Sequence, residues 1–208
     1  MRTAHPRTGP GPVGGPDALV KEDRPLDRAA ARQAVAALIA ALGVPAGGEV
    51  ARRTPERVVA GLAELLDRPG FEFTTFPNTA EQHDLVLVRA IPFTSVCAHH
   101  LLPFSGVAHV GVLPGHRLVG LSKLARAVAW CAAGLQVQEE LGQQVARFVE
   151  ERMGARGVGV VLVAEHACMN RRGVRALGAE TVTVAARGAL ADDPAARDEF
   201  LRLTGVAA

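Results

Sequence analysis

Two short clusters of cysteine and histidine are the residues of this chain best suited to chemistry. The first is the segment CAHH, which holds Cys97, His99 and His100. The second holds His166 and Cys168, which are separated by one residue. Thiolates and neutral imidazoles are ligands that zinc prefers in proteins, and catalytic zinc sites keep three protein ligands and one open position. The two clusters together therefore predict a catalytic metal site.

The spacing within each cluster suggests which side chains meet. Two residues separate Cys97 from His100, so one tight turn can present both to one ion. Residues 158–169 read as a buried strand, on which His166 and Cys168 share a face. We predict a Zn²⁺ site formed by Cys97, His100 and Cys168, although spacing alone does not choose between His99 and His100. The thiolates favour zinc over iron(II), and the unliganded histidines would carry protons.

Three further segments carry polar side chains at predicted element ends. In GLSKLAR, Ser122 is a predicted helix cap, and Lys123 and Arg126 lie on neighbouring parts of one helix face, a possible phosphate cradle or an ordinary solvated turn. QVQEE places Gln138 and Glu139 at the start of the next helix. The segment MNRRGV follows the His-x-Cys strand and brings two arginines near the expected metal.

The order of predicted elements indicates an α+β fold. A helix begins near Asp27 and stops at Gly43, and a second begins with the sequence TPE at 54–56, a cap residue followed by proline. The remaining elements are strands at 84–93 and 104–113, helices at about 122–133 and 136–153, strands at 158–169 and 181–186, and a short tail helix. Grouped strands and grouped helices favour α+β over a parallel doubly wound sheet.

Composition sets the broad class of the protein. The chain has 208 residues with a formal net charge of +2, which argues against a protein that coats nucleic acid. Its three cysteines do not form a disulfide framework, and Cys131, in a predicted helix without a nearby histidine, is expected to be a packing residue. No apolar run is long enough to span a membrane, and the N-terminus lacks a secretory pattern, so we expect a cytoplasmic protein. Residues 1–25, rich in proline and glycine, predict a disordered tail.

Several motifs, taken in order, resemble GTP cyclohydrolase I. They cover residues 25–205 and are TPERV, SVCAHHLLPFSG, VGLSKLAR, LQVQEE, EHACMNRRGV and TVTVAARG. The resemblance implies a tunnelling fold (T-fold), with an antiparallel sheet, two helices on one side and additional N-terminal helices. It divides the chain into an N-terminal helical region at 26–80 and a catalytic domain at 81–208. It also implies a homodecamer with active sites at subunit boundaries.

The resemblance assigns roles to individual positions. It implies the zinc ligands Cys97, His100 and Cys168, the catalytic residues His99, His166 and Ser122, and the substrate-binding residues Arg57, Ser122, Lys123, Arg126, Gln138, Glu139 and Arg172. Gln138 and Glu139 fall on the pair that reads the guanine edge. Arg57 falls on a phosphate-binding position that reaches a neighbouring subunit's site.

The implied reaction converts GTP and water to 7,8-dihydroneopterin triphosphate and formate, the first step of pterin synthesis. Water activated by zinc attacks the carbon between the two imidazole nitrogens of guanine, and His166 protonates the ring. The ring opens, formate leaves, and the ribose opens with help from Ser122. A rearrangement then closes the dihydropterin ring, with His99 as a proton shuttle.

Two departures from the family pattern suggest a divergent paralogue. Ala98 stands where the family has glutamate, and Ala133-Gly134-Leu135 stands where it tends to have arginine. The alternatives are a cyclohydrolase with an altered product in a specialised deazapurine or pterin pathway, and a non-catalytic or regulatory zinc-binding paralogue. The presence of His99, His166 and Glu139 counts against the second. A related nitrile reductase would need a cysteine nucleophile and no metal, and a pterin synthase would bind zinc through histidines alone.

Overall fold

A computed structural model describes residues 26–206, so the tail predicted at 1–25 lies outside the described residues. In chain order the elements are α1 (Arg28–Ala41), α2 (Glu49–Leu66), β1 (Thr75–Pro77), β2 (Val86–Cys97), β3 (Pro103–Leu113), β4 (Arg117–Val119), α3 (Leu121–Ala132), β5 (Leu135–Gln136), α4 (Gln138–Met153), β6 (Gly157–His166), α5 (Ala167–Asn170), β7 (Thr181–Gly188), α6 (Ala189–Asp192) and α7 (Pro194–Thr204). None of the described helices is long and apolar enough to cross a membrane.

Five strands form one sheet in the order β5-β2-β3-β6-β7. The pairs β2–β3, β3–β6 and β6–β7 are antiparallel, and only the short β5 runs parallel to its neighbour β2. The register places Val96 opposite Pro103 and Phe104 opposite His166. The C-terminal ends of β2 and β6 therefore meet at one end of the sheet, where the two cysteine and histidine clusters lie. A separate two-stranded sheet joins β1 and β4.

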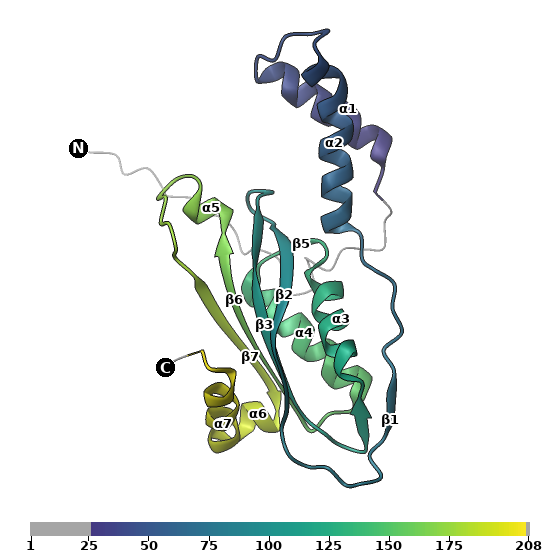
Figure 1. Ribbon diagram of the computed structural model, residues 1–208, viewed down its shortest axis with the longest axis vertical. Helices are drawn as coiled ribbons and strands as arrows, with labels where there is room; N and C mark the ends of the chain where they lie inside the picture. Colours follow the sequence, from purple (N-terminus) through teal and green to yellow (C-terminus); the bar gives the residue numbers. More distant parts are fainter. Residues whose placement is uncertain (1–25, 207–208) are drawn as a thin grey trace, which may run out of the picture.

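Helices α3 and α4 cover one face of this sheet (Figure 1). Both repeat apolar side chains at helical spacing, and the fully buried ones are Leu124, Ala127, Val128, Leu141, Val145, Ala146 and Val149. Each buried leucine or valine contributes roughly 1.5–3 kcal/mol relative to an exposed one. This apolar face, rather than intrinsic helix propensity, holds the two helices on the sheet.

The C-terminal helix α7 covers part of the opposite face through one aromatic side chain. Phe200 is completely buried and lies over two glycines of the sheet, Gly111 and Gly159. A Cβ added at Gly111 would lie 2.7 Å from the Phe200 ring, and one at Gly159 would lie 2.6 Å from it. These positions must remain glycine for α7 to pack this closely.

Helices α1 and α2 form a hairpin that projects beyond the end of the sheet (Figure 1). The first helix begins as predicted, because the Asp27 side chain accepts a hydrogen bond from the backbone N–H of Ala30. The second begins at Glu49, so the predicted start at Thr54 was wrong. Gly48 provides the extended residue that precedes the helix, and an acidic first residue favours the helix dipole. Pro55 is therefore buried inside α2, where its ring nitrogen has no hydrogen to donate to the helix.

The start of α3 also differs from the prediction. Gly120, in an extended conformation, occupies the capping position, and the Ser122 side chain makes no capping hydrogen bond. The backbone N–H of Lys123 donates to the Gly120 carbonyl at 2.7 Å. This bond spans three residues instead of the four of an α-helical hydrogen bond, so the first turn is tighter than an α-helical turn. Ser122 therefore lies inside the first turn with its side chain exposed.

Candidate active site and metal centre

A tight turn after β2 positions the first cluster. Cys97 is the last residue of β2, and its backbone carbonyl accepts hydrogen bonds from the N–H groups of His100 and Leu101. Leu101 has φ of 55°, which lets the chain reverse into β3. The Sγ atom of Cys97 lies 3.6 Å from Nδ1 of His100 and 4.0 Å from Nδ1 of His99.

The second cluster lies at the end of β6, but Cys168 is not on the strand. Strand β6 ends at His166, opposite Phe104, because the next residue of β3 is Pro103, which has no N–H to extend the ladder. Cys168 instead belongs to the helical turn α5, so the predicted shared strand face was wrong. The buried Asn170 anchors this turn by donating to Glu165 at 2.9 Å.

The two turns nevertheless bring three candidate ligands together. The ligand atoms of Cys97, His100 and Cys168 all lie within 4.8 Å of one another, a group that can hold a metal ion. Burial and the neighbouring Cys97 both raise the pKa of Cys168, because two adjacent thiols resist becoming two thiolates. Two sulfurs and one imidazole with an open side match the donor set of a catalytic zinc site.

His166 is held by contacts on two sides. Its ring stacks on Phe104 with a centroid distance of 4.5 Å and an angle of 4° between the planes. Its Nε2 atom lies 2.6 Å from Oε1 of Gln138. Burial lowers the pKa of His166, and the carboxylate of Glu139 opposes this shift in part. Phe104 was not identified from the sequence, although the strand register would have placed it opposite His166.

A cavity of about 210 Å³ contains both clusters. Its walls are formed by Cys97, His99, His100, Gln136, Val137, Gln138, Glu139, His166, Cys168, Met169 and Thr181. The sequence did not point to Gln136, Met169 or Thr181, because each carries a side chain without a metal-ligand or charge signal. Gln138 is 2% exposed, whereas Glu139 beside it is exposed. Glu139 is therefore the accessible acid of this site.

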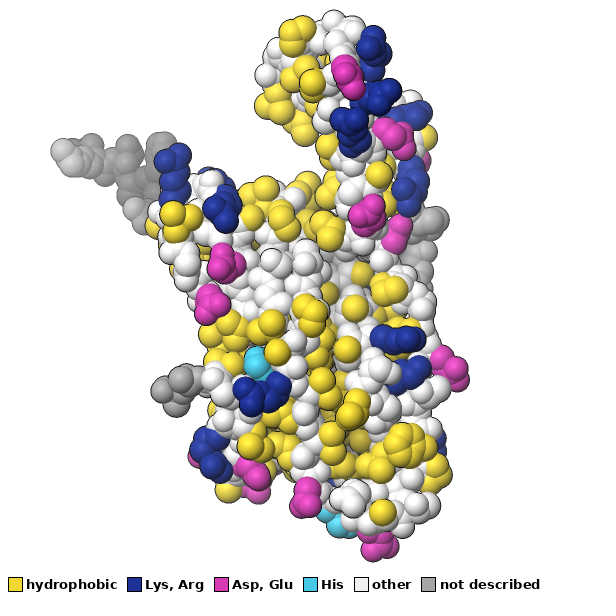
Figure 2. Space-filling view, viewed as in Figure 1, with side chains coloured by type: hydrophobic (Ala, Val, Ile, Leu, Met, Phe, Trp, Pro, Cys, Tyr) yellow, Lys and Arg dark blue, Asp and Glu magenta, His cyan; other side chains and the backbone are white. Residues whose placement is uncertain are grey.

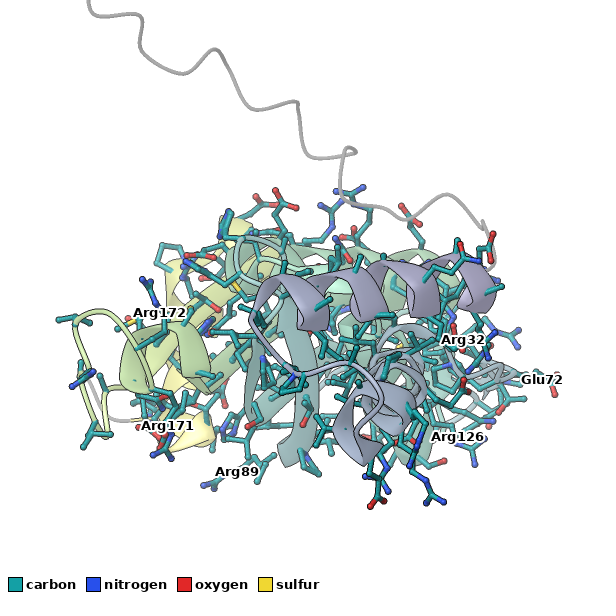
Figure 3. The ribbon with its side chains drawn as sticks, turned by 90° about the horizontal axis from the view of Figure 1, so that it is seen from above. Arg32, Glu72, Arg89, Arg126, Arg171 and Arg172 are labelled. Atoms are coloured by element: carbon teal, nitrogen blue, oxygen red, sulfur yellow. The ribbon has the colours of Figure 1, made fainter. Side chains whose placement is uncertain are left out.

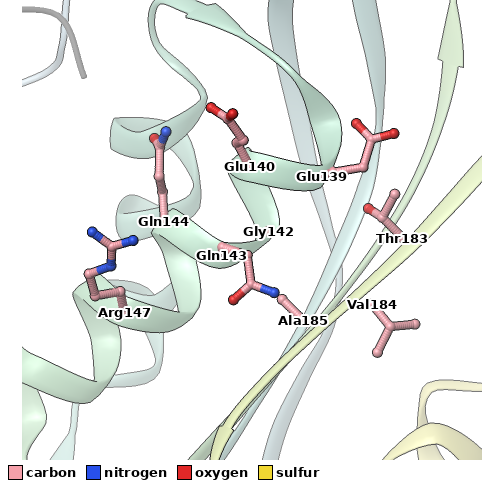
Figure 4. Close-up of a pocket in the computed structure, with 9 residues that line it drawn as sticks. All are labelled: Glu139, Glu140, Gly142, Gln143, Gln144, Arg147, Thr183, Val184 and Ala185. Carbon is pink, nitrogen blue, oxygen red and sulfur yellow. The ribbon is translucent and has the colours of Figure 1, made fainter. Parts of the chain in front are cut away.

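Glu139 also borders a larger groove. This groove, of about 470 Å³, lies between the start of α4 and the edge strand β7 (Figure 4). Its polar lining includes Glu140, Gln144, Arg147 and Thr183. The acid therefore stands where the metal-containing cavity meets an open groove at the edge of the sheet.

The remaining predicted substrate residues do not reach this cavity within one chain. Ser122 and Lys123 lie in the first turn of α3 and Arg126 lies near its middle, whereas the end of α3 leads directly into β5 beside Cys97. A 12-residue helix is about 18 Å long. Arg126 and Arg172 accordingly lie on opposite sides of the molecule in Figure 3.

The last two predicted arginines are solvent-exposed. Arg172 follows α5 in the turn at 171–175, close in sequence to Cys168. Arg57 lies on α2 in the projecting hairpin. One chain therefore presents the candidate ligands with His99, His166 and Glu139 in one cavity, and the charge of Arg172 acts on Cys168. The other predicted phosphate contacts, Arg57, Ser122, Lys123 and Arg126, do not line that cavity.

Comparison with known proteins places this site in a family. The family model for GTP cyclohydrolase I matches residues 31–205. The chain belongs to the GTP cyclohydrolase I family. A protein of Leifsonia xyli named GTP cyclohydrolase 1 is 45% identical over 187 residues, covering 88% of this chain and 97% of the relative. The GTP cyclohydrolase 1 of Aquifex aeolicus is 40% identical, and the match covers 86% of this chain and 97% of that protein. The GTP cyclohydrolase 1 of Streptococcus thermophilus is 45% identical, and the match covers 82% of this chain and 94% of that protein.

GTP cyclohydrolase I proteins have the tunnelling fold, and the described sheet with α3 and α4 on one face is that fold. Ala98, where the sequence predicted a departure from the family motif, is half-buried. Its backbone N–H donates to the Gln136 carbonyl at 3.0 Å and so ties the turn to β5. Alanine at this position therefore keeps the backbone hydrogen bond that holds the turn presenting Cys97 and His100.

Proposed function

We propose that this protein is a zinc-dependent GTP cyclohydrolase that converts GTP and water to 7,8-dihydroneopterin triphosphate and formate. The observation that carries the proposal is a single cavity containing a Cys97-His100-Cys168 donor set, His166 and Glu139. The relatives named GTP cyclohydrolase 1 support GTP as the substrate.

The donor set fits zinc. Thiolates and imidazole are preferred zinc ligands, and three protein ligands leave the fourth tetrahedral position open. When bound there, zinc supplies a Lewis acid that activates water near neutral pH. Cys97, His100 and Cys168 would hold the ion, and the exposed His99 lies beside them at the cavity wall.

The chain's own residues supply recognition and proton transfer. The Glu139 carboxylate accepts hydrogen bonds from the ring N–H and the amino group of guanine, which selects guanine over adenine. His166 delivers a proton to the imidazole ring of the base as the bond to the departing carbon breaks. Burial lowers the pKa of His166, so the protonated ring gives up its proton more readily than a free imidazolium does.

Phosphate binding in this proposal uses a second copy of the chain. Ser122 and Lys123 stand at the far end of α3 from the cavity, Arg126 stands near the middle of that helix, and Arg57 stands on the projecting hairpin. We propose a homo-oligomer, a decamer as in the family, in which these groups face a neighbouring subunit's cavity. Exposed hydrophobic side chains on the hairpin and on the open sheet face support such contacts (Figure 2); they include Leu38, Leu42, Val50, Val182 and Val184.

Incubation of the zinc-loaded protein with GTP tests the proposal. Formate release and a fluorescent pterin after oxidation are expected, and both should disappear with a chelator or with His166→Ala. Formate without pterin would show that the base ring opens while the later rearrangement stalls. Neither product from folded, metal-bound protein would overturn the proposed activity. Light scattering of the same sample measures the assembly, and a stable monomer that turns over GTP would contradict the two-chain site.

A further inference from the structure

Gln138 has a fully committed side-chain amide. Its Nε2 group donates to the backbone carbonyls of Thr181 at 2.8 Å and Leu162 at 3.3 Å, and lies 3.2 Å from the Thr183 hydroxyl. An amide NH₂ group carries only two hydrogens, and the two carbonyls can only accept. These contacts use the donor side of Gln138 entirely within the chain.

The same carbonyls determine which way the amide points. A flipped amide would place its oxygen against the carbonyl oxygens of Leu162 and Thr181, two acceptors without hydrogen. The amide oxygen must therefore face His166, whose Nε2 lies 2.6 Å away. Because an amide oxygen only accepts, the hydrogen of this bond belongs to Nε2 of His166.

We propose that Gln138 is a positioning residue that keeps a hydrogen on Nε2 of His166 and so makes Nδ1 the ring nitrogen that exchanges a proton with the substrate. This inference rests on the proposed cyclohydrolase function. Nδ1 takes the proton that the attacking water loses as its oxygen bonds to the carbon of the base, and gives that proton to a nitrogen of the base as the carbon–nitrogen bond breaks. The ring then returns to the neutral Nε2–H form. Stacking on the buried Phe104 fixes the plane of the ring while Gln138 fixes its hydrogen.

The arrangement separates two side chains that the sequence had predicted to act as a pair. Gln138 is 2% exposed, and its side-chain amide has no free donor for a purine edge. Glu139 is exposed and lines both the cavity and the adjoining groove. Base reading by a side chain therefore falls to Glu139, and the side chain of Gln138 acts on the reaction only through His166.

Kinetics of Gln138→Met, a substitution of similar size without hydrogen-bonding groups, test this assignment. We expect kcat to fall at least about tenfold while KM for GTP stays within about twofold, as for other residues that orient a catalytic imidazole. Ser95→Ala is the matched control, because it removes another buried hydrogen bond, from Oγ to the Ala132 carbonyl, outside the cavity. Metal content and melting temperature establish that each variant is folded.

GTP binding in a His166→Ala background distinguishes positioning from base reading. With His166 absent, adding Gln138→Met should change neither the residual rate nor the Kd for GTP. A Kd raised tenfold or more would mean that Gln138 contacts the base, and the proposal would be overturned. If Gln138→Met does not fold, Thr183→Val removes one polar contact of the amide while Gln138 stays. A rise in KM without a fall in kcat in that variant would also contradict the proposal.

The ring hydrogen can be observed without turnover. Solid-state NMR of zinc-loaded protein carrying ¹⁵N-histidine should show His166, identified by its loss in His166→Ala, as the Nε2–H tautomer. In Gln138→Met the signal should shift towards a tautomer mixture. An Nδ1–H tautomer in the unmodified protein would refute the inference even if GTP is converted. Conversely, the expected tautomer in a protein that releases no formate would confirm that Gln138 keeps the hydrogen on Nε2 of His166. It would at the same time remove the proposed function.

Discussion

At the scale of single residues, the surroundings of the three cysteines decide what each thiol can do. Cys131 lies buried between α3 and the sheet, and burial raises the pKa of its thiol to about 12, against a smaller opposing effect of Arg68. Such a thiol stays protonated and serves as packing, as predicted from its lone position in the sequence. Cys97 and Cys168 instead share a cavity with an imidazole. The difference depends on neighbours that are distant along the chain.

Ala98 is the residue at which the chain's own chemistry can be tested most directly. We expect Ala98→Glu to raise GTP turnover by about tenfold, because a carboxylate beside the ligand turn would orient a histidine there, and such supporting groups are worth about 10- to 100-fold. Formate release and product identity at matched zinc content provide the measurement. An unchanged rate and product would remove the main support for a functionally divergent paralogue. Ala155→Glu, at another half-buried alanine outside the cavity, controls for the mere addition of charge.

His109 should make stability fall in acid. It is 6% exposed, its Nδ1 has no hydrogen-bond partner among the described residues, and burial, followed by the charge of Arg89, lowers its pKa. Below about pH 6.5 the unfolded chain binds a proton that the folded chain refuses. The free energy of unfolding therefore rises with pH through this range and is lost on acidification.

Replacing His109 with leucine should flatten this acid dependence, since the variant has no proton to gain at that position. Urea unfolding between pH 5 and pH 8 measures the effect. His116→Leu removes an exposed histidine and should leave the slope as it was. An equally steep acid loss in His109→Leu would show that other groups, such as the partly buried His166, dominate it.

At the scale of elements, α7 is expected to stabilise the sheet from the face opposite the metal cluster. Phe200→Ala removes a fully buried ring over Gly111 and Gly159, and such truncations cost about 3–5 kcal/mol. We expect denaturant unfolding to show this loss while zinc content stays unchanged. Leu203→Ala, on the same helix and 47% exposed, should cost much less. Loss of zinc from folded Phe200→Ala would mean that the two faces are coupled.

The elements also show where sequence patterns were sufficient and where they were not. The apolar periodicity of α3, α4 and the strands predicted the α+β layers, because burial requires that pattern. The start of α2 was misplaced, since Thr-Pro-Glu is also tolerated inside a helix whose real beginning is marked only by Gly48. Cys168 was put on a strand because nothing in its own segment shows that Pro103 of another strand ends the ladder. Local signals do not contain such pairings.

The candidate site was predictable in its chemistry more than in its arrangement. The spacing of Cys97 and His100 indicated a shared turn, and the structure brings Cys168 to them. The internal hydrogen bonds of Gln138 were not visible in the sequence, because they depend on carbonyls of β6 and β7 exposed to α4 by the sheet register. Roles that require a distant backbone partner appear only once the strands are aligned.

At the scale of the whole molecule, the separation of Ser122, Lys123 and Arg126 from the cavity predicts that two inactive variants will restore each other. Arg126→Ala would lack the proposed phosphate contact and His166→Ala the proposed proton donor, so each variant alone should be nearly inactive. If every site combines groups from two chains, random reassembly of an equal mixture leaves about a quarter of the sites with both groups intact.

Unfolding the mixed variants together, refolding them with zinc and measuring formate release provides the test. Mixing without unfolding, and refolding each variant alone, should give no recovery. Failure to recover activity in mixed, fully assembled oligomers would mean that each chain completes its own site, and that Arg126 reaches the cavity by a movement of α3.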